Sequence, residues 1–130
     1  MFDKAEYWIK ICDEDIVTSK WLWEGNRLLH CGFFCHLIAE KSLKAVIARN
    51  TGRTPPKIHD LIKLARLGKV YDNLSEKHLG LIEELDQFQI EARYPEYRAR
   101  IAKTLTKGKM ERIFTETEDF LCWIKKRLGQ

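Results

Sequence analysis

The segment 27–49 constrains the fold more than any other part of the sequence, because it is apolar over most of the circumference of a helix. Its solvent-facing edge is expected to be narrow and to consist of Glu40, Lys41 and Lys44. A helix of this kind is buried from several sides. In a chain of 130 residues, part of that cover could come from a second subunit. The apolar positions around the rest of the helix are Cys31, Phe33, Phe34, Leu37, Ile38, Leu43, Ala45, Val46 and Ile47.

The stretch before this segment has the pattern of a long amphipathic helix. Asp3 is its expected start, because its side chain can accept hydrogen bonds from the amides of the first turn. Glu6, three residues later, completes a pair that resembles a capping box. The apolar pattern continues to Trp23, and the following Gly25-Asn26 is a helix stop.

Three further helical segments follow a loop over 50–56. The third of the long helices must end near Tyr94, because Pro95 disfavours the α conformation at the residue before it. The expected elements are a short helix over 58–67, a long helix from Asn73 or Ser75 to Tyr94, a polar, basic connection over 95–107 with room for half a helix, and a last helix over 108–128.

Composition agrees with a helical, globular chain. Hydrophobic residues are 45% and charged residues 32%, which excludes a disordered and a membrane-embedded chain. No apolar run approaches the roughly 20 residues of a spanning helix, and the charged start is unlike a secretory signal peptide. With no strand pattern and no internal repeat, the sequence predicts an all-α fold in one domain over 1–130. We expect an antiparallel up-and-down helical bundle of four long helices and one short helix, located in the cytoplasm.

The cysteines predict no disulfide and no metal centre. None of the four stands in a C-x-x-C pair, and a reducing compartment is expected. Cys31 and Cys35 share a helical face, whereas His30 and His36 point away from it on opposite sides. Four ligands therefore cannot converge from this segment, and buried, reduced thiols are expected. No cofactor is predicted.

Positive charge is concentrated late in the chain. Between Arg93 and Arg112 there are seven cations and two anions, a net charge of +5 against +4 for the whole chain. A stretch that carries more than the net charge is a candidate contact for the phosphates of a nucleotide or RNA. The alternative interpretation, a solvated loop and helix face, stays open.

One pair of residues has the spacing of a metal-independent RNA-cleaving dyad. Arg53 and His59 are separated by five residues, but Pro55-Pro56 between them prevents one continuous helix. His59 directly before Asp60 also suits an orienting or capping role at a helix start. The acidic runs over 13–15 and 83–86 are expected to be solvated faces. No Gly-rich phosphate loop or hydrolase elbow is present.

An unusual local cluster opens the basic stretch. The segment 91–97 places Arg93, Tyr94 and Tyr97 at a proline-terminated helix end. Arginine is a planar donor for phosphate, and tyrosine can stack on a base while offering a hydroxyl. A helix terminator with packed tyrosines is the alternative.

Three short motifs in this order resemble the HEPN domain family. They are His36-Leu37-Ile38-Ala39-Glu40-Lys41-Ser42-Leu43-Lys44-Ala45, then His59-Asp60-Leu61 after a proline-bearing loop, and then Ala92-Arg93-Tyr94-Pro95. The similarity covers roughly Ala5 to Leu128 and extends to the helical C-terminal domain of kanamycin-type nucleotidyltransferases. It implies an all-α bundle that usually dimerises and works beside a small nucleotidyltransferase. Many members are toxins that cleave RNA, with the transferase as antitoxin.

The family's catalytic pair, an arginine and a histidine four to six residues apart on a late helix, is not matched. The position offers Arg93, but no histidine follows it in the next seven residues. Cleavage of RNA needs a group of near-neutral pKa to take the 2′-hydroxyl proton, and arginine is too basic. The resemblance therefore implies the fold and nucleotide association without the dyad.

The sequence as a whole predicts a HEPN module that binds nucleotide or RNA phosphate, dimerises and pairs with a nucleotidyltransferase in a toxin–antitoxin-like system, without its own catalysis. One alternative is a metal-independent ribonuclease toxin that uses His59 or a histidine from the second subunit. Another is a structural adaptor whose contact surface is the apolar belt of 27–49. The expected phosphate-binding residues are Lys44, His59, Arg93, Tyr94, Tyr97, Arg98 and Arg100.

Overall fold

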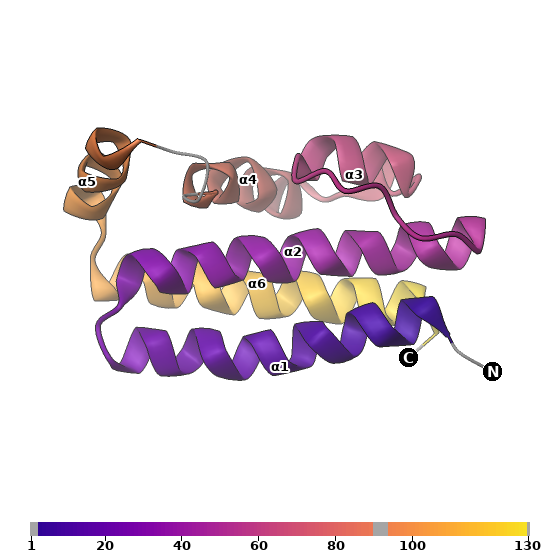
Figure 1. Ribbon diagram of the computed structural model, residues 1–130, viewed down its shortest axis with the longest axis horizontal. Helices are drawn as coiled ribbons and strands as arrows, with labels where there is room; N and C mark the ends of the chain where they lie inside the picture. Colours follow the sequence, from indigo (N-terminus) through magenta and orange to yellow (C-terminus); the bar gives the residue numbers. More distant parts are fainter. Residues whose placement is uncertain (1–2, 90–93, 130) are drawn as a thin grey trace.

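The computed structural model describes residues 3–89 and 94–129, and every regular element in this part is helical (Figure 1). The predicted all-α bundle is confirmed. Its elements are α1 (Lys4–Glu24), α2 (Leu28–Thr51), α3 (Leu61–Leu67), the 3₁₀ turn η1 (Tyr71–Asn73), α4 (Glu76–Leu85), the 3₁₀ turn η2 (Asp86–Phe88), α5 (Pro95–Thr104) and α6 (Lys107–Arg127).

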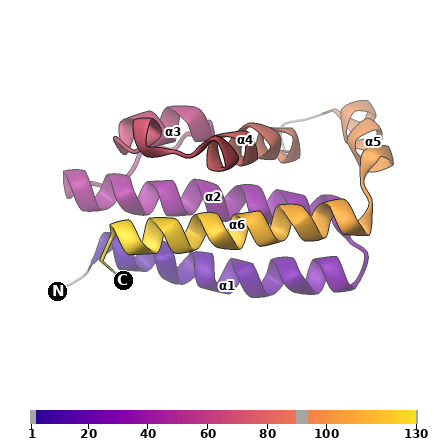
Figure 2. The same cartoon turned by 180° about the vertical axis from the view of Figure 1, so that it is seen from behind.

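The helices form two layers around α2. The three long helices α1, α2 and α6 lie side by side, and α3 and α4 cover the opposite side of α2 (Figures 1 and 2). The short helix α5 lies at the end of the bundle where α1 turns into α2 and α6 begins (Figure 1). Both termini lie at the other end (Figure 2). No helix in the two described stretches is long and apolar enough to cross a membrane.

Most of helix α2 is covered by its own chain, but Phe33, Phe34 and Leu37 are only partly buried, so cover by a second subunit stays a prediction. Contacts from α1, α3, α4, η2 and α6 bury it from both layers. The expected solvent-facing edge is wrong at two positions, because Glu40 and Lys44 are buried. The part of the apolar belt left for the adaptor alternative is therefore limited to these partly buried side chains.

Local sequence signals placed several helix ends correctly. The Asp3 carboxylate accepts from the backbone N–H of Ala5 at 2.9 Å and of Glu6 at 3.2 Å, which caps α1. The Ser75 hydroxyl accepts from the His78 N–H at 3.0 Å and caps α4. These side chains satisfy amides that a helix leaves without partners.

Two predicted helix boundaries are wrong. The short helix begins at Leu61 instead of residue 58, because the Asp60 side chain accepts from the Lys63 N–H at 3.1 Å and caps it there. Helix α4 ends at Leu85 instead of near Tyr94. The Gln87 side chain donates to the Glu84 carbonyl at 3.0 Å, which satisfies a helix-end carbonyl, and the chain then tightens into η2.

The expected connection over 95–107 contains a full helix of ten residues, α5, with Pro95 in its first turn. A residue in the first turn of a helix donates no hydrogen bond within the helix, so the missing N–H of Pro95 costs nothing there, and its fixed φ is that of a helix. Tyr94 is the N-cap in extended conformation. The described residues therefore hold three long and three short α-helices instead of four long and one short.

Three of the four cysteines are buried as expected, whereas Cys122 is exposed. The Ser19 hydroxyl lies 3.4 Å from the Cys31 sulfur and 3.5 Å from the Cys35 sulfur, between α1 and α2. Hydrogen bonding between the two thiols lowers the pKa of Cys31 to about 7 and, together with burial, raises that of Cys35. This small polar cluster lies inside the core, away from solvent.

The turn η2 is fitted to α2 through a glycine. Phe88 is fully buried, and a Cβ at Gly32 would lie only 2.4 Å from the Phe88 Cδ1 atom and 2.7 Å from its Cγ atom. The ring therefore occupies the space that any side chain at residue 32 would need. This contact fixes where the chain leaves α4 relative to the first turns of α2.

Candidate functional site

Positive side chains from three helices gather at one end of the bundle, which we term the cationic end. In an antiparallel bundle α2 begins where α1 ends, and α6 begins at that same end, with α5 beside it (Figure 1). A tight turn with Asn26 at a φ of 59° joins α1 to α2. The cationic end consists of Arg27 at the start of α2, Arg98, Arg100 and Lys103 on α5, and Lys107 and Lys109 at the start of α6. The polar side chain of His30, in the first turn of α2, lies at the same end.

A cleft of about 360 Å³ lies between the start of α2 and the last turn of α5. Its polar side chains are those of Asn26, Arg27 and His30, and Ala102 and Leu105 form the α5 side. Arg98 is one helical turn before Ala102 and therefore lies on the same face of α5. The cleft thus combines an apolar wall on the α5 side with the side chain of Arg27, and Arg98 lies one turn away along α5.

The first turn of α2 favours an anion in this cleft. Its N-cap residue, Arg27, makes no side-chain capping hydrogen bond, and the turn contains no acidic residue. The first amides of a helix have no partner within the helix, and the dipole of a 24-residue helix places partial positive charge there. Phosphate and carboxylate groups bind at such helix starts.

Lys107 is held in place at the cationic end by contacts with α1. Its ammonium lies 4.6 Å from the centre of the Trp23 ring and donates to the Glu24 carbonyl at 3.4 Å. The Trp23 indole N–H in turn donates to the Lys107 carbonyl at 2.9 Å. These contacts join the last turn of α1 to the first turn of α6 and hold Lys107 at the cationic end.

The tyrosines predicted to contact a nucleotide lie on α5 and at its start. Tyr94 is 81% exposed. Tyr97 is partly buried, and the Arg100 guanidinium lies 5.7 Å from the centre of its ring. No residue of α5 is fully buried, so the helix presents most of its side chains to solvent. Arg93 lies outside the described residues.

Two of the predicted phosphate ligands are not at the cationic end. Lys44 is sixteen residues further along α2 than Leu28, which is about 24 Å in a helix. His59 precedes α3 and lies beside the same part of α2. Both contact Glu40 and belong to a separate cluster.

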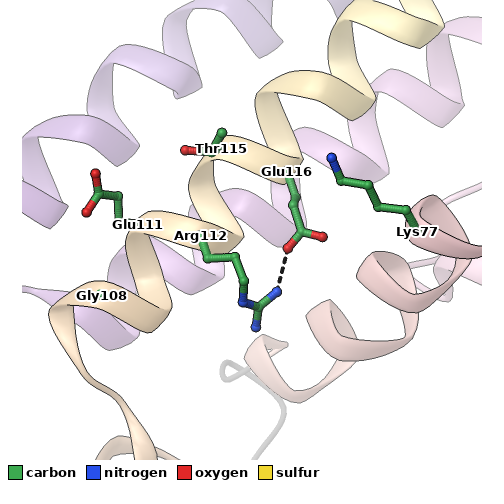
Figure 3. Close-up of a pocket in the computed structure, with 6 residues that line it drawn as sticks. All are labelled: Lys77, Gly108, Glu111, Arg112, Thr115 and Glu116. Carbon is green, nitrogen blue, oxygen red and sulfur yellow. Dashed lines mark hydrogen bonds and ion pairs between the residues drawn. The ribbon is translucent and has the colours of Figure 1, made fainter.

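Arg112, the last cation of the predicted basic stretch, is bound by acidic neighbours. Its guanidinium donates to the Glu84 carboxylate of α4 at 2.8 Å. It also donates to Glu116, one turn along α6 (Figure 3). The hydrogen bond that Arg112 donates to Glu84, followed by the one that it donates to Glu116, raises the pKa of Arg112 above its ordinary value. The adjoining cavity of about 600 Å³ is lined by Lys77 and by both signs of charge, so it offers no surplus positive charge to a phosphate.

A buried ionic cluster surrounds Glu40 in the middle of α2. Glu40 and Lys44 are only 4% and 6% exposed, and the Lys44 ammonium donates to the Glu40 Oε2 atom at 3.1 Å. The same ammonium lies 5.7 Å from the centre of the Trp8 ring. The His59 Nδ1 atom lies 2.9 Å from the Glu40 Oε1 atom, while the His59 side chain is 56% exposed. A buried carboxylate that orients a solvent-exposed imidazole is an arrangement suited to a general base.

A second imidazole in this cluster has no hydrogen-bond partner. His36 is buried, and its Nδ1 atom lies 3.8 Å from the Glu40 Oε1 atom, too far for a hydrogen bond. Both of its ring nitrogens lack a partner. Burial lowers the pKa of His36, and the opposing fields of Glu40 and Asp86 only partly offset this. Within the described stretches, no three His, Cys, Asp or Glu side chains are arranged to hold a metal ion.

Sequence reasoning missed Arg27 and His30 because they are about 70 residues away from the basic stretch. A signal was present: a Gly25-Asn26 turn followed by a cation at the start of a helix whose first turn has no acidic residue. The antiparallel topology then brings this helix start to the end where the basic stretch begins.

Comparison with known proteins gives one match. The family model described as HEPN domain matches residues 5–128. No curated protein and no solved structure matches the chain significantly.

Proposed function

This chain belongs to the HEPN domain family, whose model spans residues 5–128, and on this premise we propose that it is a nucleotide- or RNA-phosphate-binding module. The observation that carries the proposal is the cationic end, where cations of α5 and of the start of α6 share one end of the bundle with Arg27 at the uncapped start of α2 (Figure 1). The proposed site includes Arg27, His30, Arg98 and Arg100. Tyr94 and Tyr97 complete it from the side of the α5 start. Arg93, which lies outside the described residues, is included from the sequence alone.

The chemistry of each group suits a phosphorylated ligand. First-turn amides of α2 donate to phosphate oxygens, and the guanidinium of Arg27 or Arg98 adds charge-assisted hydrogen bonds. The exposed ring of Tyr94 offers a face on which a base can stack. Lys44 is not part of this site, because its ammonium is buried against Glu40. Arg112 is not part of it either, because two carboxylates hold it.

Binding should be measured by fluorescence anisotropy with a labelled single-stranded oligoribonucleotide, and by titration calorimetry with mononucleotides. If phosphate contacts dominate, the logarithm of the association constant falls linearly with that of salt concentration, with a slope of about −0.7 per contacted phosphate. Arg27→Ala and Arg98→Ala should each weaken binding about tenfold, as expected for a charge-assisted contact.

The matched control is Lys126→Ala, which removes an exposed lysine from the last turn of α6, at the other end of the bundle. It should leave the affinity unchanged. Absence of binding to RNA and to every nucleotide, or equal losses in Arg27→Ala and Lys126→Ala, would refute the cationic end as the binding site.

The proposal also includes a homodimer, a cytoplasmic location and a nucleotidyltransferase partner in a toxin–antitoxin-like system. These parts rest on the family resemblance. Co-purification with a transferase from a neighbouring reading frame, followed by a growth assay with each gene expressed alone and together, tests the pairing. No co-purification and no toxicity would remove this part of the proposal.

A second candidate function, metal-independent RNA cleavage, is favoured by one specific observation, the contact between His59 and Glu40. In this reaction His59 takes the proton of a 2′-hydroxyl, the 2′-oxygen attacks phosphorus, and the 5′-oxygen leaves and is protonated by solvent. The products are a 2′,3′-cyclic phosphate and a 5′-hydroxyl. Cleavage by the purified protein that His59→Ala abolishes and Arg53→Ala weakens would establish it. Cleavage unchanged by His59→Ala would exclude His59.

A further inference from the structure

A second group of basic side chains lies in the segment 53–69, far from the cationic end along α2. This segment has five cations and one carboxylate, Asp60, and therefore a net charge of +4. All five cationic side chains are exposed to solvent. We term them the α3 basic surface, which consists of Arg53 and Lys57 in the loop after α2, Lys63 and Arg66 on α3, and Lys69 just after α3.

The fold brings the loop and α3 side by side. The contact of His59 with Glu40 at 2.9 Å places the start of α3 beside the middle of α2. At the other end of α3, the Asn50 side chain donates to the Gly68 carbonyl at 3.0 Å, so α3 ends beside the last turn of α2. The loop between the two helices therefore runs back over the same stretch of α2, next to α3 (Figure 1). The cations of the loop and of α3 consequently belong to one region of the surface.

The positive charge of this surface is not balanced by carboxylates. None of its five cations has an ion-pair partner in the part of the chain that the structure describes. Exposed lysines on other helices do have one: Lys77 pairs with Asp119, and Lys125 pairs with Asp13. The α3 basic surface is therefore free to bind an anion without first breaking an ion pair.

Acidic side chains limit this surface on the side of α4. Asp60, Glu83 and Asp86 line a cleft of about 330 Å³ together with Leu61, Ile62 and Ile82. This cleft repels an anion. A polyanion on α3 therefore lies toward the loop and away from α4.

Arg66 is positioned to bind a phosphate group. The centre of its guanidinium lies 3.9 Å from the centre of the Tyr71 ring, and its N–H groups donate to nothing within the described residues. Contact with the ring restricts the guanidinium and leaves its N–H edge to the ligand, where two parallel N–H groups match two phosphate oxygens. Lys63, one turn earlier, projects from the same face of α3 and adds a second positive charge.

The extent of the surface favours a strand over a single nucleotide. Helix α3 has seven residues and is about 10 Å long, and the cations of the loop lie beside it. A mononucleotide has its charge at one point and contacts one or two of these cations. Successive phosphates of a strand contact the cations of both the loop and the helix.

We propose that the α3 basic surface is a second binding site for a single strand of RNA, held through its phosphates. This inference rests on the proposed function for the class of its ligand, but it uses no residue of the cationic end. Helix α3 lies beside residues 40–50 of α2, about 18 to 33 Å from Leu28 along the helix axis. This separation exceeds the Debye length of about 8 Å at physiological salt, so the two sites bind independently.

The α3 site is the weaker of the two. Its helix is short, and Asp60 already caps the first turn, whereas the long helix α2 begins at the cationic end without a side-chain cap. Long-helix amides are therefore available to phosphate at the cationic end only, and at α3 the cationic side chains supply the affinity.

Titration calorimetry of the whole chain with hexauridylate at low salt tests this proposal. The native chain should bind two molecules, with two different affinities. Lys63→Glu/Arg66→Glu should remove the weaker site and leave one molecule bound with the affinity of the tighter site, because it replaces two phosphate-binding cations by anions. Arg27→Ala should weaken the tighter site about tenfold and leave the α3 site unchanged.

Two variants control for net charge. Lys10→Glu/Lys126→Glu makes the same change of charge at exposed lysines of α1 and α6, in the layer opposite α3, and should keep both sites. Arg66→Lys keeps the charge but removes the planar pair of donors, and it should weaken the α3 site several-fold. An α3 site unaffected by Arg66→Lys would overturn the role of the guanidinium.

One hexauridylate bound per native chain, or equal loss of the weaker site in Lys10→Glu/Lys126→Glu, would overturn the proposal. Tighter binding of polyglutamate than of oligouridylate at α3 would assign the surface to an acidic protein instead of RNA. Failure of the cationic end gives a different result from failure of this surface. If the cationic end does not bind RNA, Lys63→Glu/Arg66→Glu abolishes all binding, whereas if the α3 basic surface does not bind RNA, the same variant changes nothing.

Discussion

Replacing Gly32 by alanine tests the contact on which the position of η2 depends. Alanine is the better helix former by about 1 kcal/mol in an ordinary helix interior. At Gly32, however, the new Cβ would lie 2.4 to 2.7 Å from three atoms of the Phe88 ring, including its root atom Cγ. Phe88 is fully buried, so the ring cannot swing into solvent. Overpacking of this kind costs about 1 to 3 kcal/mol, and we expect Gly32→Ala to destabilise the protein by this amount.

Gly80 in α4 provides a matched control for this substitution. A Cβ at Gly80 meets nothing within 4 Å, and the residue is exposed in the interior of a helix. Gly80→Ala should therefore stabilise the protein by about 0.5 to 1 kcal/mol. The two substitutions are chemically identical, and the structure predicts opposite signs for them.

Urea unfolding followed by circular dichroism at 222 nm measures both free energies of unfolding. Phe88→Leu in the Gly32→Ala background supplies the second side of a double-mutant cycle. Phe88→Leu should lower the free energy of unfolding less in the Gly32→Ala background than in the native chain, because the smaller leucine makes room for the new methyl group. A Gly32→Ala variant as stable as the native chain, or more stable, would refute the packing argument for η2.

Three further predictions concern the charged and titratable groups. His36→Leu should raise the free energy of unfolding at pH 7, because it removes two buried nitrogens without partners. Because burial lowers the folded-state pKa of His36, the stability of the native chain falls as pH decreases from about 6.5 toward that pKa. Urea titrations at several pH values should therefore show a weaker pH dependence of stability in the variant. Lys44→Ala should cost about 3 to 5 kcal/mol in thermal or urea unfolding, because it leaves Glu40 buried without its cation, and a loss below 1 kcal/mol would contradict the buried pair. Arg112→Ala should leave nucleotide affinity unchanged in the anisotropy assay and destabilise the chain by less than about 1 kcal/mol, because its guanidinium is about half exposed and solvent screens its ion pairs. A tenfold weaker complex would show that Arg112 belongs to the site.

Features set by neighbours in sequence were predictable. The caps at Asp3 and Ser75 depend on side chains two or three residues from the amides that they satisfy, and both were located correctly. The central place of α2 followed from its apolar circumference. The end of α4 was not predictable in this way, because the apolar spacing from Leu81 through Leu85 to Phe88 is the same for an α-helix and for the 3₁₀ turn that the chain adopts.

The state of a charged side chain was not predictable from its position in the sequence. Glu40 and Lys44 are one turn apart on α2, and in an isolated amphipathic helix such a pair marks the solvated face. Here α1 and the segment before α3 close over both sides of α2, so the pair is buried. Whether one face of a helix is exposed to solvent depends on how many neighbouring elements pack against it, and the hydrophobic periodicity of that helix does not show how many there are.

The same reasoning explains why the positive charge of the basic stretch is redistributed in the fold. Arg112 on α6 donates a hydrogen bond to Glu84 on the neighbouring helix α4. A cation that lies among other cations in the sequence is therefore neutralised in the fold. Arg27 is far from the stretch in sequence, but it stands at the same end of the bundle because α2 and α6 both begin there and run antiparallel to α1 (Figure 1). The electrostatic potential at the proposed phosphate site therefore depends more on the topology of the bundle than on how many lysines and arginines are close together in sequence. In an up-and-down bundle, every second connection between helices lies at the same end. The positive charge of the cationic end is therefore the sum of the cations near the α1–α2 turn and those near the start of α6.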